Sequence, residues 1–316
     1  MRILVTGVTG FVGQHLVRAW HQQFPTAEIW GVLREEENRA TPLHGHFTLD
    51  LTDDAAVHHQ FSQDCAFDWI VHLAAQSFVP ESFAHPQETW QVNLWGTFHL
   101  LEALRQGAFQ GRLLFVGSGG EYGKVEEDHL PVHEQHPLRP LDPYTASKAA
   151  AEMLCSQYRH MAPFDIVLAR SFNHSGPGQS PQFVVANFAR QVAQIDLGQQ
   201  EPVLTVGNIE VTRDFLDVRD VVEAYRCLLE RGQSGEAYNV CSGREVPLAE
   251  VIATLVGCAS RPIEVRIDPT RLRPTDAPRV CGSHEKLTAH TGWQPQRDIT
   301  ATLREAVAYW KSELTR

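Results

Sequence analysis

The sequence predicts an α/β protein in which a doubly wound, mainly parallel sheet is followed by a smaller C-terminal α/β lobe. The first half of the 316-residue chain alternates short apolar runs with helical patterns, as βαβ units do. After about residue 170 the elements become shorter, and turn-rich segments such as Ser171–Gln182 separate them. We therefore expect residues 1–170 to form a first domain, residues 171–316 to form mainly a second, and parts of 208–242 to return to the first.

The individual elements follow from apolar runs and from amphipathic periods. In the first part we expect strands at Arg2–Thr6, Glu28–Leu33, Phe67–Leu73, Gly111–Val116 and Asp165–Arg170, and helices at Phe11–Phe24, Thr89–Arg105 and Ala146–His160. In the second part we expect helices at Phe183–Leu197, Val218–Glu230 and Ile299–Glu313, and short strands near Val203–Val206 and Ala237–Val240. The Pro- and Arg-rich segment Arg261–Ala277 is expected to be irregular.

Composition and charge exclude several classes of protein. With 38 acidic and 27 basic side chains the formal net charge is −11, which argues against nucleic acid or a membrane surface as partner. No apolar run approaches the roughly 20 residues of a membrane span. The 6 cysteines are scattered, which favours free thiols and a cytoplasmic protein, and the histidine spacing predicts no metal site.

A glycine-rich turn joins the first expected strand to the first expected helix. Gly7, Gly10 and Gly13 stand at dinucleotide-binding spacing, with Thr9, Phe11 and Val12 between them. Glycine allows backbone amides to approach a pyrophosphate, whose charge a helix N-terminus favours. The first domain is therefore predicted to be a Rossmann-type domain that binds a nicotinamide dinucleotide.

The end of the second expected strand bears on the choice of cofactor. An acidic residue there would accept hydrogen bonds from the ribose 2′-hydroxyl and repel a 2′-phosphate. The strand leads instead into Arg34, whose guanidinium suits a phosphate. NADP(H) is therefore preferred, and NAD(H) is left possible.

Tyr144 and Lys148 stand at i and i+4, so a helix places them on one face. A neighbouring ammonium stabilises a phenolate and lowers the pKa of the phenol, which makes proton transfer feasible near neutral pH. Ser118 follows the expected strand and can hydrogen-bond the same substrate oxygen. These three residues are the predicted catalytic set.

Taken together, these motifs resemble the extended short-chain dehydrogenase/reductase family. Within it the chain is most similar to GDP-mannose 4,6-dehydratases and GDP-4-keto-6-deoxymannose reductases. The likeness also runs through Asn93 and the segments Phe172–His174, Gly176–Gln179, Val206–Asn208, Arg213–Asp220 and Leu272–Asp276.

The resemblance implies roles for further residues. Asp50 and Leu51 would hold the adenine, Leu73, Ala74, Ala75 and Gln76 would line the pyrophosphate and nicotinamide ribose, and Lys148 would also bind that ribose. A GDP-sugar would be held by Asn173, Val184, Asn187, Arg213, Arg273 and Asp276, although Asn187 replaces the lysine expected of a dehydratase. The family further implies a homodimer.

One position separates the two activities that the resemblance allows. Related dehydratases carry a serine or threonine at the position of Ser118 and a glutamate two residues later. This glutamate removes the proton from C5 of the sugar. Here that position is Gly120, and Glu121 would face away if the stretch were extended. We therefore expect NADPH-dependent reduction of the C4 ketone of GDP-4-keto-6-deoxy-D-mannose to GDP-D-rhamnose. The alternatives are GDP-mannose 4,6-dehydration or another nucleotide-sugar epimerase or reductase activity of the family.

Overall fold

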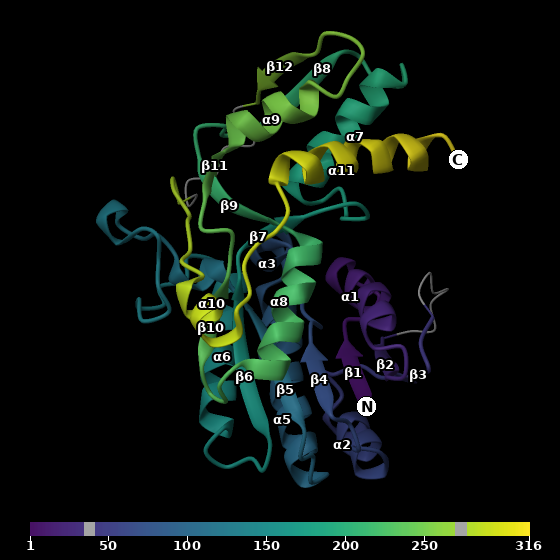
Figure 1. The fold of residues 1–316 in the computed structure, drawn as a ribbon, viewed down its shortest axis with the longest axis vertical. Coiled ribbons are helices and arrows are strands. Elements are labelled where there is room, and N and C mark those ends of the chain that lie inside the picture. The colour runs from purple at the N-terminus through teal and green to yellow at the C-terminus, as the bar shows by residue number, and fades with distance from the viewer. Residues whose placement is uncertain (35–41, 269–276) are drawn as a thin grey trace.

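A computed structural model describes residues 1–34, 42–268 and 277–316. Within these ranges the central sheet has seven strands in the order β10-β6-β5-β4-β1-β2-β3, and all neighbouring strands run parallel. Their bounds are β1 (Arg2–Thr6), β2 (Glu28–Leu33), β3 (Gly45–Thr48), β4 (Trp69–His72), β5 (Arg112–Ser118), β6 (Asp165–Ser171) and β10 (Ala237–Val240). Figure 1 shows this sheet with helices on its flanks, which confirms the predicted fold class.

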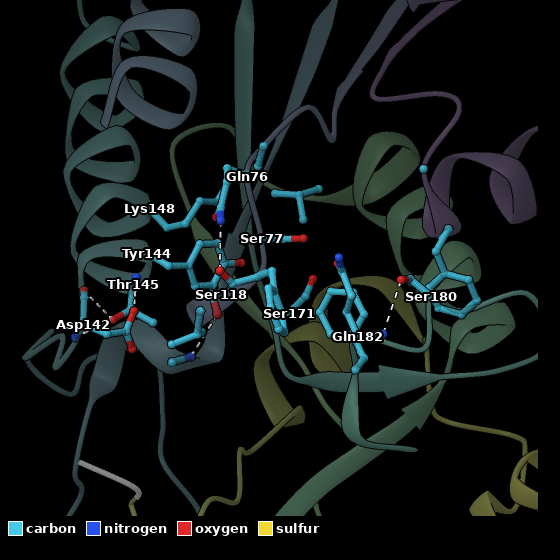
Figure 2. Close-up of a pocket in the computed structure, with 18 of the residues that line it drawn as sticks. Gln76, Ser77, Ser118, Asp142, Tyr144, Thr145, Lys148, Ser171, Ser180 and Gln182 are labelled. Atoms are coloured by element: carbon cyan, nitrogen blue, oxygen red, sulfur yellow. Dashed lines mark hydrogen bonds between the residues drawn. The ribbon is translucent and has the colours of Figure 1, made fainter. Parts of the chain in front are cut away.

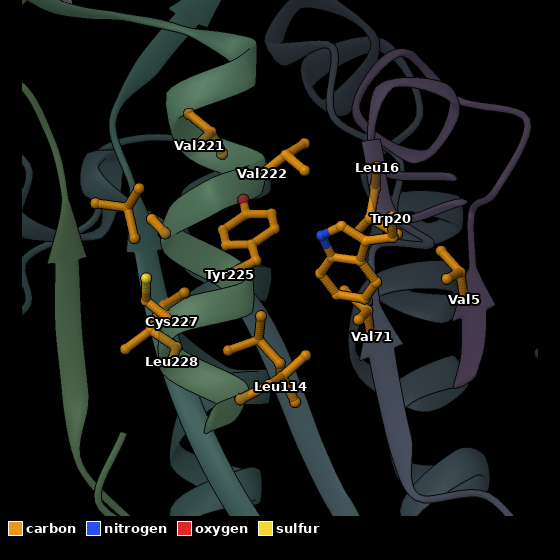
Figure 3. Packing of buried hydrophobic residues seen from close by; sticks show 14 of the residues in the cluster. Val5, Leu16, Trp20, Val71, Leu114, Val221, Val222, Tyr225, Cys227 and Leu228 are labelled. Carbon is orange, nitrogen blue, oxygen red and sulfur yellow. The ribbon is translucent and has the colours of Figure 1, made fainter. Parts of the chain in front are cut away.

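One face of the sheet is covered by α1 (Phe11–Gln23) and α8 (Val218–Arg231), which pack against each other. Figure 3 shows Trp20 of α1 and Tyr225 of α8 in the layer of side chains between these helices and the sheet. Both aromatic side chains are completely buried. Burial of apolar side chains from both helices against the sheet is the main contribution to the stability of this layer.

The opposite face carries α2 (Asp54–Gln63), α5 (Gly96–Gln106) and α6 (Pro143–Tyr158). Two short helices, α3 (Val79–Ala84) and α4 (Pro86–Trp90), precede a π-helical turn, η1 (Gln91–Trp95), that runs directly into α5. The predicted helix Thr89–Arg105 therefore exists, but a π turn interrupts its hydrogen bonding. Such turns are rare and are frequently found at functional sites.

The C-terminal part adds two small sheets above the ends of the central strands (Figure 1). One pairs β11 (Glu245–Pro247), β9 (Thr212–Asp217) and β7 (Asn173–Ser175), and the other pairs β12 (Glu264–Ile267) with β8 (Val203–Val206). A separate hydrophobic cluster joins them to α7 (Val184–Asp196), α9 (Leu248–Val256) and α11 (Ile299–Leu314). Because β10 pairs with β6 and α8 packs on α1, residues 218–240 belong structurally to the central sheet. The exact division into two domains stays a prediction.

Several elements differ from the sequence-based expectation. The segment expected to be irregular, Arg261–Ala277, contains β12, whose four residues are all exposed and pair parallel with β8. The short strand β7 lies within the stretch expected to be turns. The sequence analysis also missed β3, α2, β9, β11, α9 and α10 (Glu285–Thr291), as well as the short turns η2 (Gly119–Tyr122) and η3 (Glu127–His129). Most are too short for a periodic pattern to be visible.

Candidate active site

A cavity of about 1850 Å³ lies at the carboxyl ends of the central strands and reaches into the C-terminal part. Every predicted site residue that the structure describes lines it: Gly7, Thr9, Gly10, Phe11, Val12, Gly13, Arg34, Asp50, Leu51, Leu73, Ala74, Ala75, Gln76, Ser118, Tyr144, Lys148, Asn173, Val184, Asn187 and Arg213. Arg273 and Asp276 lie outside the described residues. The fold thus gathers residues that are far apart in the sequence, while their individual roles stay predictions.

The glycine turn lies tightly against neighbouring backbone. Gly7 has φ +67°, and a Cβ on it would come within 2.8 Å of the Ala74 nitrogen. A Cβ on Gly13 would lie 2.5 Å from the Gly7 carbonyl oxygen. Helix α1 begins after Gly10 without a side-chain cap and without an acidic residue in its first turn. The first amides of α1 therefore lack a side-chain cap, and uncapped amides at a helix N-terminus are suited to bind an anion.

The wall beside this turn, residues 73–76, is held by buried polar side chains. The Ala74 amide donates to the Thr6 hydroxyl at 3.1 Å. Asn93, on the π turn, accepts the Gln76 amide through Oδ1 at 2.8 Å and donates through Nδ2 to the Gln76 carbonyl at 3.0 Å. The same Nδ2 donates to Ser147 on α6 at 2.9 Å. Asn93 therefore links residues 73–76 to α6, the helix that carries Tyr144 and Lys148.

The start of α6 determines where Tyr144 and Lys148 lie. Asp142 caps the helix by accepting the Thr145 amide at 2.8 Å, and Pro143 occupies its first position. Tyr144 and Lys148 therefore lie one turn apart, and Figure 2 shows both extending from α6 toward Ser118. Ser118 is the last residue of β5, rather than lying beyond the strand as expected.

Of the predicted catalytic side chains, Lys148 is buried, whereas Ser118 and Tyr144 are half-buried in the cavity lining. Burial raises the pKa of Tyr144, and a hydrogen bond with the Ser118 side chain opposes that rise. Burial lowers the pKa of Lys148, whose Nζ lies 4.6 Å from the centre of the Phe115 ring. The pKa of Tyr144 is therefore raised, and not lowered by Lys148 as expected from the sequence, so the phenol keeps its proton near neutral pH. This arrangement can deliver a proton to a substrate oxygen.

Glu121 lies outside the cavity, but for a different reason from the one expected from the sequence. The stretch after Ser118 is not extended but forms the 3₁₀ turn η2, so the alternation assumed for Glu121 is wrong. Glu121 is nevertheless directed inward and fully buried, with Oε1 accepting the Ser118 amide at 2.6 Å. Gly120 lines the cavity, and a Cβ there would lie 2.7 Å from the Thr145 methyl group. Residues 118–123 therefore present no carboxylate to the cavity.

The side chains predicted to bind substrate are already engaged with the protein. Arg213, on β9, donates from Nη1 to the carbonyl oxygens of Thr212 and Ala277. Asn187, on α7, donates to the Pro181 carbonyl at 2.9 Å and accepts from Gln191 at 2.7 Å. These bonds orient both side chains along the cavity lining.

Sequence reasoning missed several aromatic side chains of the cavity. Phe78 and Phe183 pack edge to face with ring centroids 6.1 Å apart, and Tyr225 hydrogen-bonds Ser171 at 2.7 Å. His174 stacks on Phe11 of the glycine turn. All of them line the cavity. The positions of Phe78, Phe183 and Tyr225 depend on chain segments that meet only in the folded protein, and no local motif marks them, whereas His174 belongs to the Phe172–His174 segment of the family resemblance.

Metal-binding clusters and membrane-spanning helices are both absent from the described residues. No group of three or more His, Cys, Asp or Glu side chains is arranged to hold a metal ion there. No helix in these ranges is both long enough and apolar enough to cross a membrane.

Comparison with known proteins places this site in a family. The model of the GDP-mannose 4,6 dehydratase family matches residues 4–306, nearly the whole chain. The chain belongs to the GDP-mannose 4,6-dehydratase family. This membership confirms the predicted resemblance and assigns the chain to the nucleotide-sugar oxidoreductases with a short-chain dehydrogenase/reductase fold.

Relatives within and near this family cover the chain almost completely. A GDP-6-deoxy-D-mannose reductase of Pseudomonas aeruginosa is 41% identical over 313 residues, 99% of this chain and 98% of the relative. The solved structure of RMD from Pseudomonas aeruginosa complexed with NADPH has 40% identity and a TM-score of 0.85, covering 99% of each chain. The UDP-glucose 4-epimerase of Thermus thermophilus complexed with NAD has 33% identity and a TM-score of 0.85, covering 98% of this chain and 99% of that one.

Proposed function

We propose that this family member uses NADPH to reduce the C4 ketone of GDP-4-keto-6-deoxy-D-mannose, forming GDP-D-rhamnose. The observation that carries the proposal is the pairing of a complete Ser118, Tyr144 and Lys148 set with Gly120, where a dehydratase needs a base. The similarity to a GDP-6-deoxy-D-mannose reductase supports it.

The cavity fits a nicotinamide dinucleotide. A Cβ on Gly7 or Gly13 would clash with neighbouring backbone at this turn. Glycine is expected at such positions where a pyrophosphate binds directly to backbone amides. Arg34 is exposed just after β2 and lines the cavity, so its guanidinium is placed to bind a 2′-phosphate. The NADPH complex of the similar RMD structure supports the same choice. When bound, NADPH supplies the hydride that reduces the ketone.

The remaining chemistry belongs to this chain's side chains. Tyr144 carries its proton near neutral pH because burial raises the pKa of the phenol. It donates that proton to the C4 oxygen, which becomes the product hydroxyl, while Ser118 orients the same oxygen. Lys148 then stabilises the phenolate until solvent returns the proton. Arg213 and Asn173 line the same cavity, and their side chains would bind the diphosphate of the nucleotide sugar.

The main alternative, a dehydratase, needs a base that removes the proton from C5 of the sugar, whereas a reductase needs none. The carboxylate of Asp142 also lines the cavity, but its Oδ1 caps α6 by accepting the Thr145 amide. General-base catalysis typically contributes about 10²–10⁴-fold, so elimination without a carboxylate at the position of Gly120 should be slow.

The deciding assay supplies two substrate pairs and identifies the products by mass spectrometry. With the preformed 4-keto-6-deoxy sugar, the enzyme should oxidise one NADPH per sugar reduced. With GDP-mannose and NADP, no 4-keto-6-deoxy product should form. Robust dehydration of GDP-mannose that is lost in Glu121→Gln would overturn the proposal in favour of a dehydratase.

We also propose a homodimer in the cytoplasm. Phe83 on α3, Trp95 at the π turn and Met153 on α6 are 55%, 51% and 69% exposed, on helices that pack together. Large exposed apolar side chains on helices that pack together favour an interface, although Phe83 also lines the cavity. All six cysteines are free, which fits a reducing compartment. Light scattering should give a dimer mass for the wild type and a monomer mass for Met153→Glu.

A further inference from the structure

A buried arginine lies between the two elements that carry the predicted catalytic side chains. Arg170, near the end of β6, is 7% exposed, and its neighbours Glu152 and Tyr122 are 4% and 1% exposed. In the register of the central sheet Arg170 pairs with Gly117, the residue before Ser118. Arg170, Glu152 and Tyr122 are not among the described residues that line the cavity. An effect of Arg170 on the site must therefore pass through other residues.

On one side the guanidinium of Arg170 binds α6. Its Nε and Nη2 donate to the two carboxylate oxygens of Glu152 at 3.0 and 2.6 Å. This bidentate geometry needs the planar fork of an arginine, and a lysine ammonium cannot reproduce it. Glu152 stands one helical turn after Lys148. The ion pair therefore fixes this part of α6 against β6.

On its other side the guanidinium binds the turn that follows Ser118. Nη1 donates to the Tyr122 hydroxyl at 2.7 Å, and the guanidinium carbon lies 5.0 Å from the centre of the Tyr122 ring. Tyr122 is the last residue of η2, and its hydroxyl donates in turn to Asn239 on β10 at 2.7 Å. Nη1 also donates to the Glu134 carbonyl at 2.9 Å. One planar group of Arg170 thus joins η2 to α6.

The turn η2 and the helix α6 pack tightly where the catalytic side chains begin. A Cβ on Gly120, within η2, would lie 2.7 Å from the methyl group of Thr145 on α6. Ser118 directly precedes η2, and Tyr144 directly precedes Thr145. A shift of η2 against α6 therefore changes the separation of the Ser118 and Tyr144 side chains.

The stability of the fold does not by itself account for a charged pair at this depth. The desolvation of two buried charges offsets much of their attraction, so apolar residues of similar volume are often at least as stable. The fork of Arg170, in contrast, gives a fixed geometry that apolar packing does not supply.

We propose that Arg170 is a positioning residue of this active site: it sets the separation of Ser118 from Tyr144 by joining η2 to α6. Arg170 acts through Tyr122 and Glu152. The effect on turnover rests on the proposed reductase activity, whereas the position of Ser118 against Tyr144 can be measured without substrate.

The test variant is Arg170→Lys, which keeps a buried positive charge beside Glu152 but cannot bond the Tyr122 hydroxyl as well. A misplacement of about 1 Å at a reacting centre can cost on the order of 10²-fold in rate, so kcat with the keto-sugar should fall by that order. The dissociation constant for NADPH should stay unchanged, because Asn93, rather than Arg170, holds the backbone of Gln76 in the cofactor site.

The matched control is Arg226→Lys on α8, where Nε of the arginine donates to both carboxylate oxygens of Glu223 at 3.1 Å. It should leave kcat unchanged. A wild-type kcat in folded Arg170→Lys overturns the proposal, and so does a fall in kcat with an equal loss of NADPH affinity.

A second variant covers the case in which Arg170→Lys does not fold. Tyr122→Phe removes only the hydroxyl through which Arg170 binds η2, and it should lower kcat at unchanged NADPH affinity. Its control is Tyr158→Phe, at another buried tyrosine, whose hydroxyl donates to Glu102. Equal kcat in Tyr122→Phe and the wild type would overturn the proposal.

NMR of the free protein gives a readout that does not depend on activity. Tyrosine labelled with ¹³C at Cζ gives one signal for each of the 6 tyrosines, and Tyr144→Phe identifies the signal of Tyr144. Ser118→Ala shows how this signal moves when the serine side chain no longer bonds the phenol. Arg170→Lys should move it in the same direction.

A purely structural role of Arg170 would lower the melting temperature and leave the Tyr144 signal in place, which would overturn the proposal. If the wild type oxidises no NADPH with the keto-sugar, the proposed function fails, and the Tyr144 signal still decides the role of Arg170.

Discussion

The hydroxyl of Thr6 and Nδ1 of His72 lie 2.8 Å apart on paired positions of β1 and β4. The Thr6 oxygen accepts the Ala74 amide, and its own hydrogen is available to Nδ1 of His72. Burial lowers the pKa of His72 and keeps the imidazole neutral, so Nε2 can donate to Thr97, which lies 3.0 Å away and donates to the Asn93 carbonyl at 2.7 Å. This chain of bonds supports the cavity wall only while the imidazole lacks a second proton.

The first prediction is an acid sensitivity caused by His72. Burial lowers the pKa of His72 to about 3, and the charge of Lys148 adds to the shift. Since the unfolded chain binds this proton more readily, stability is present above the unfolded value near 6.5 and is lost as pH falls below it. Between pH 6.5 and 5 His72 should cost the wild type about 2 kcal/mol of unfolding free energy.

Urea unfolding of wild type and His72→Gln at both pH values measures this difference. His72→Gln should be less stable than the wild type at neutral pH, because it loses part of the hydrogen-bond chain. Its free energy of unfolding should fall less than that of the wild type between pH 6.5 and 5. The control is His160→Gln, at an exposed histidine, which should retain the wild-type dependence. Identical pH dependence in all three proteins would show that His72 takes up a proton in the folded state.

The second prediction concerns proton donation by Tyr144. Tyr144→Phe removes only the hydroxyl, so turnover with the keto-sugar should fall by about 10²–10⁴-fold while the GDP-sugar still binds. The matched control is Tyr158→Phe on the same helix, whose hydroxyl donates to Glu102. Steady-state kinetics and calorimetric binding separate the two effects. Wild-type rates in Tyr144→Phe would remove this residue from the mechanism.

The third prediction concerns the choice between NADPH and NADH. Arg34→Ala should weaken NADPH binding by about 1.5–3 kcal/mol, the usual value of a hydrogen bond to a charged group, and leave NADH binding unchanged. The control is Arg18→Ala, which removes an exposed arginine of α1 that does not line the cavity. The ratio of kcat/KM for the two cofactors is the measurement. Equal use of both cofactors by the wild type would make Arg34 a simple surface base.

The fourth prediction tests the glycine cradle. Gly7→Ala places a Cβ against the Ala74 backbone at a φ of +67°, so NADPH binding should be lost and the melting temperature lowered. Gly292→Ala is the control, since Gly292 has φ +75° but nothing within 4 Å of its Cβ position. It should lower the melting temperature only slightly and leave NADPH binding intact. Tight NADPH binding by Gly7→Ala would argue against a pyrophosphate at this turn.

Much of this protein can be predicted from short stretches of sequence. The bounds of β1, β2, β8 and β10 agree with expectation, as does the junction of β1 and α1, because an apolar run or a glycine turn specifies each of them locally. The spacing of Tyr144 and Lys148 likewise depends only on the pitch of one helix. These features need no knowledge of what packs against them.

The tertiary structure alone decided the features that depend on distant partners. Strand β12 exists because its backbone pairs with β8, some sixty residues earlier, although its side chains are exposed. Glu121 turns inward because the 3₁₀ turn lets its carboxyl group accept the Ser118 amide in a space that Gly117 leaves open. The Thr6–His72–Thr97 chain joins residues from three elements. Hydrogen bonds and burial of this kind depend on three-dimensional contacts, which leave no periodic trace in a single sequence.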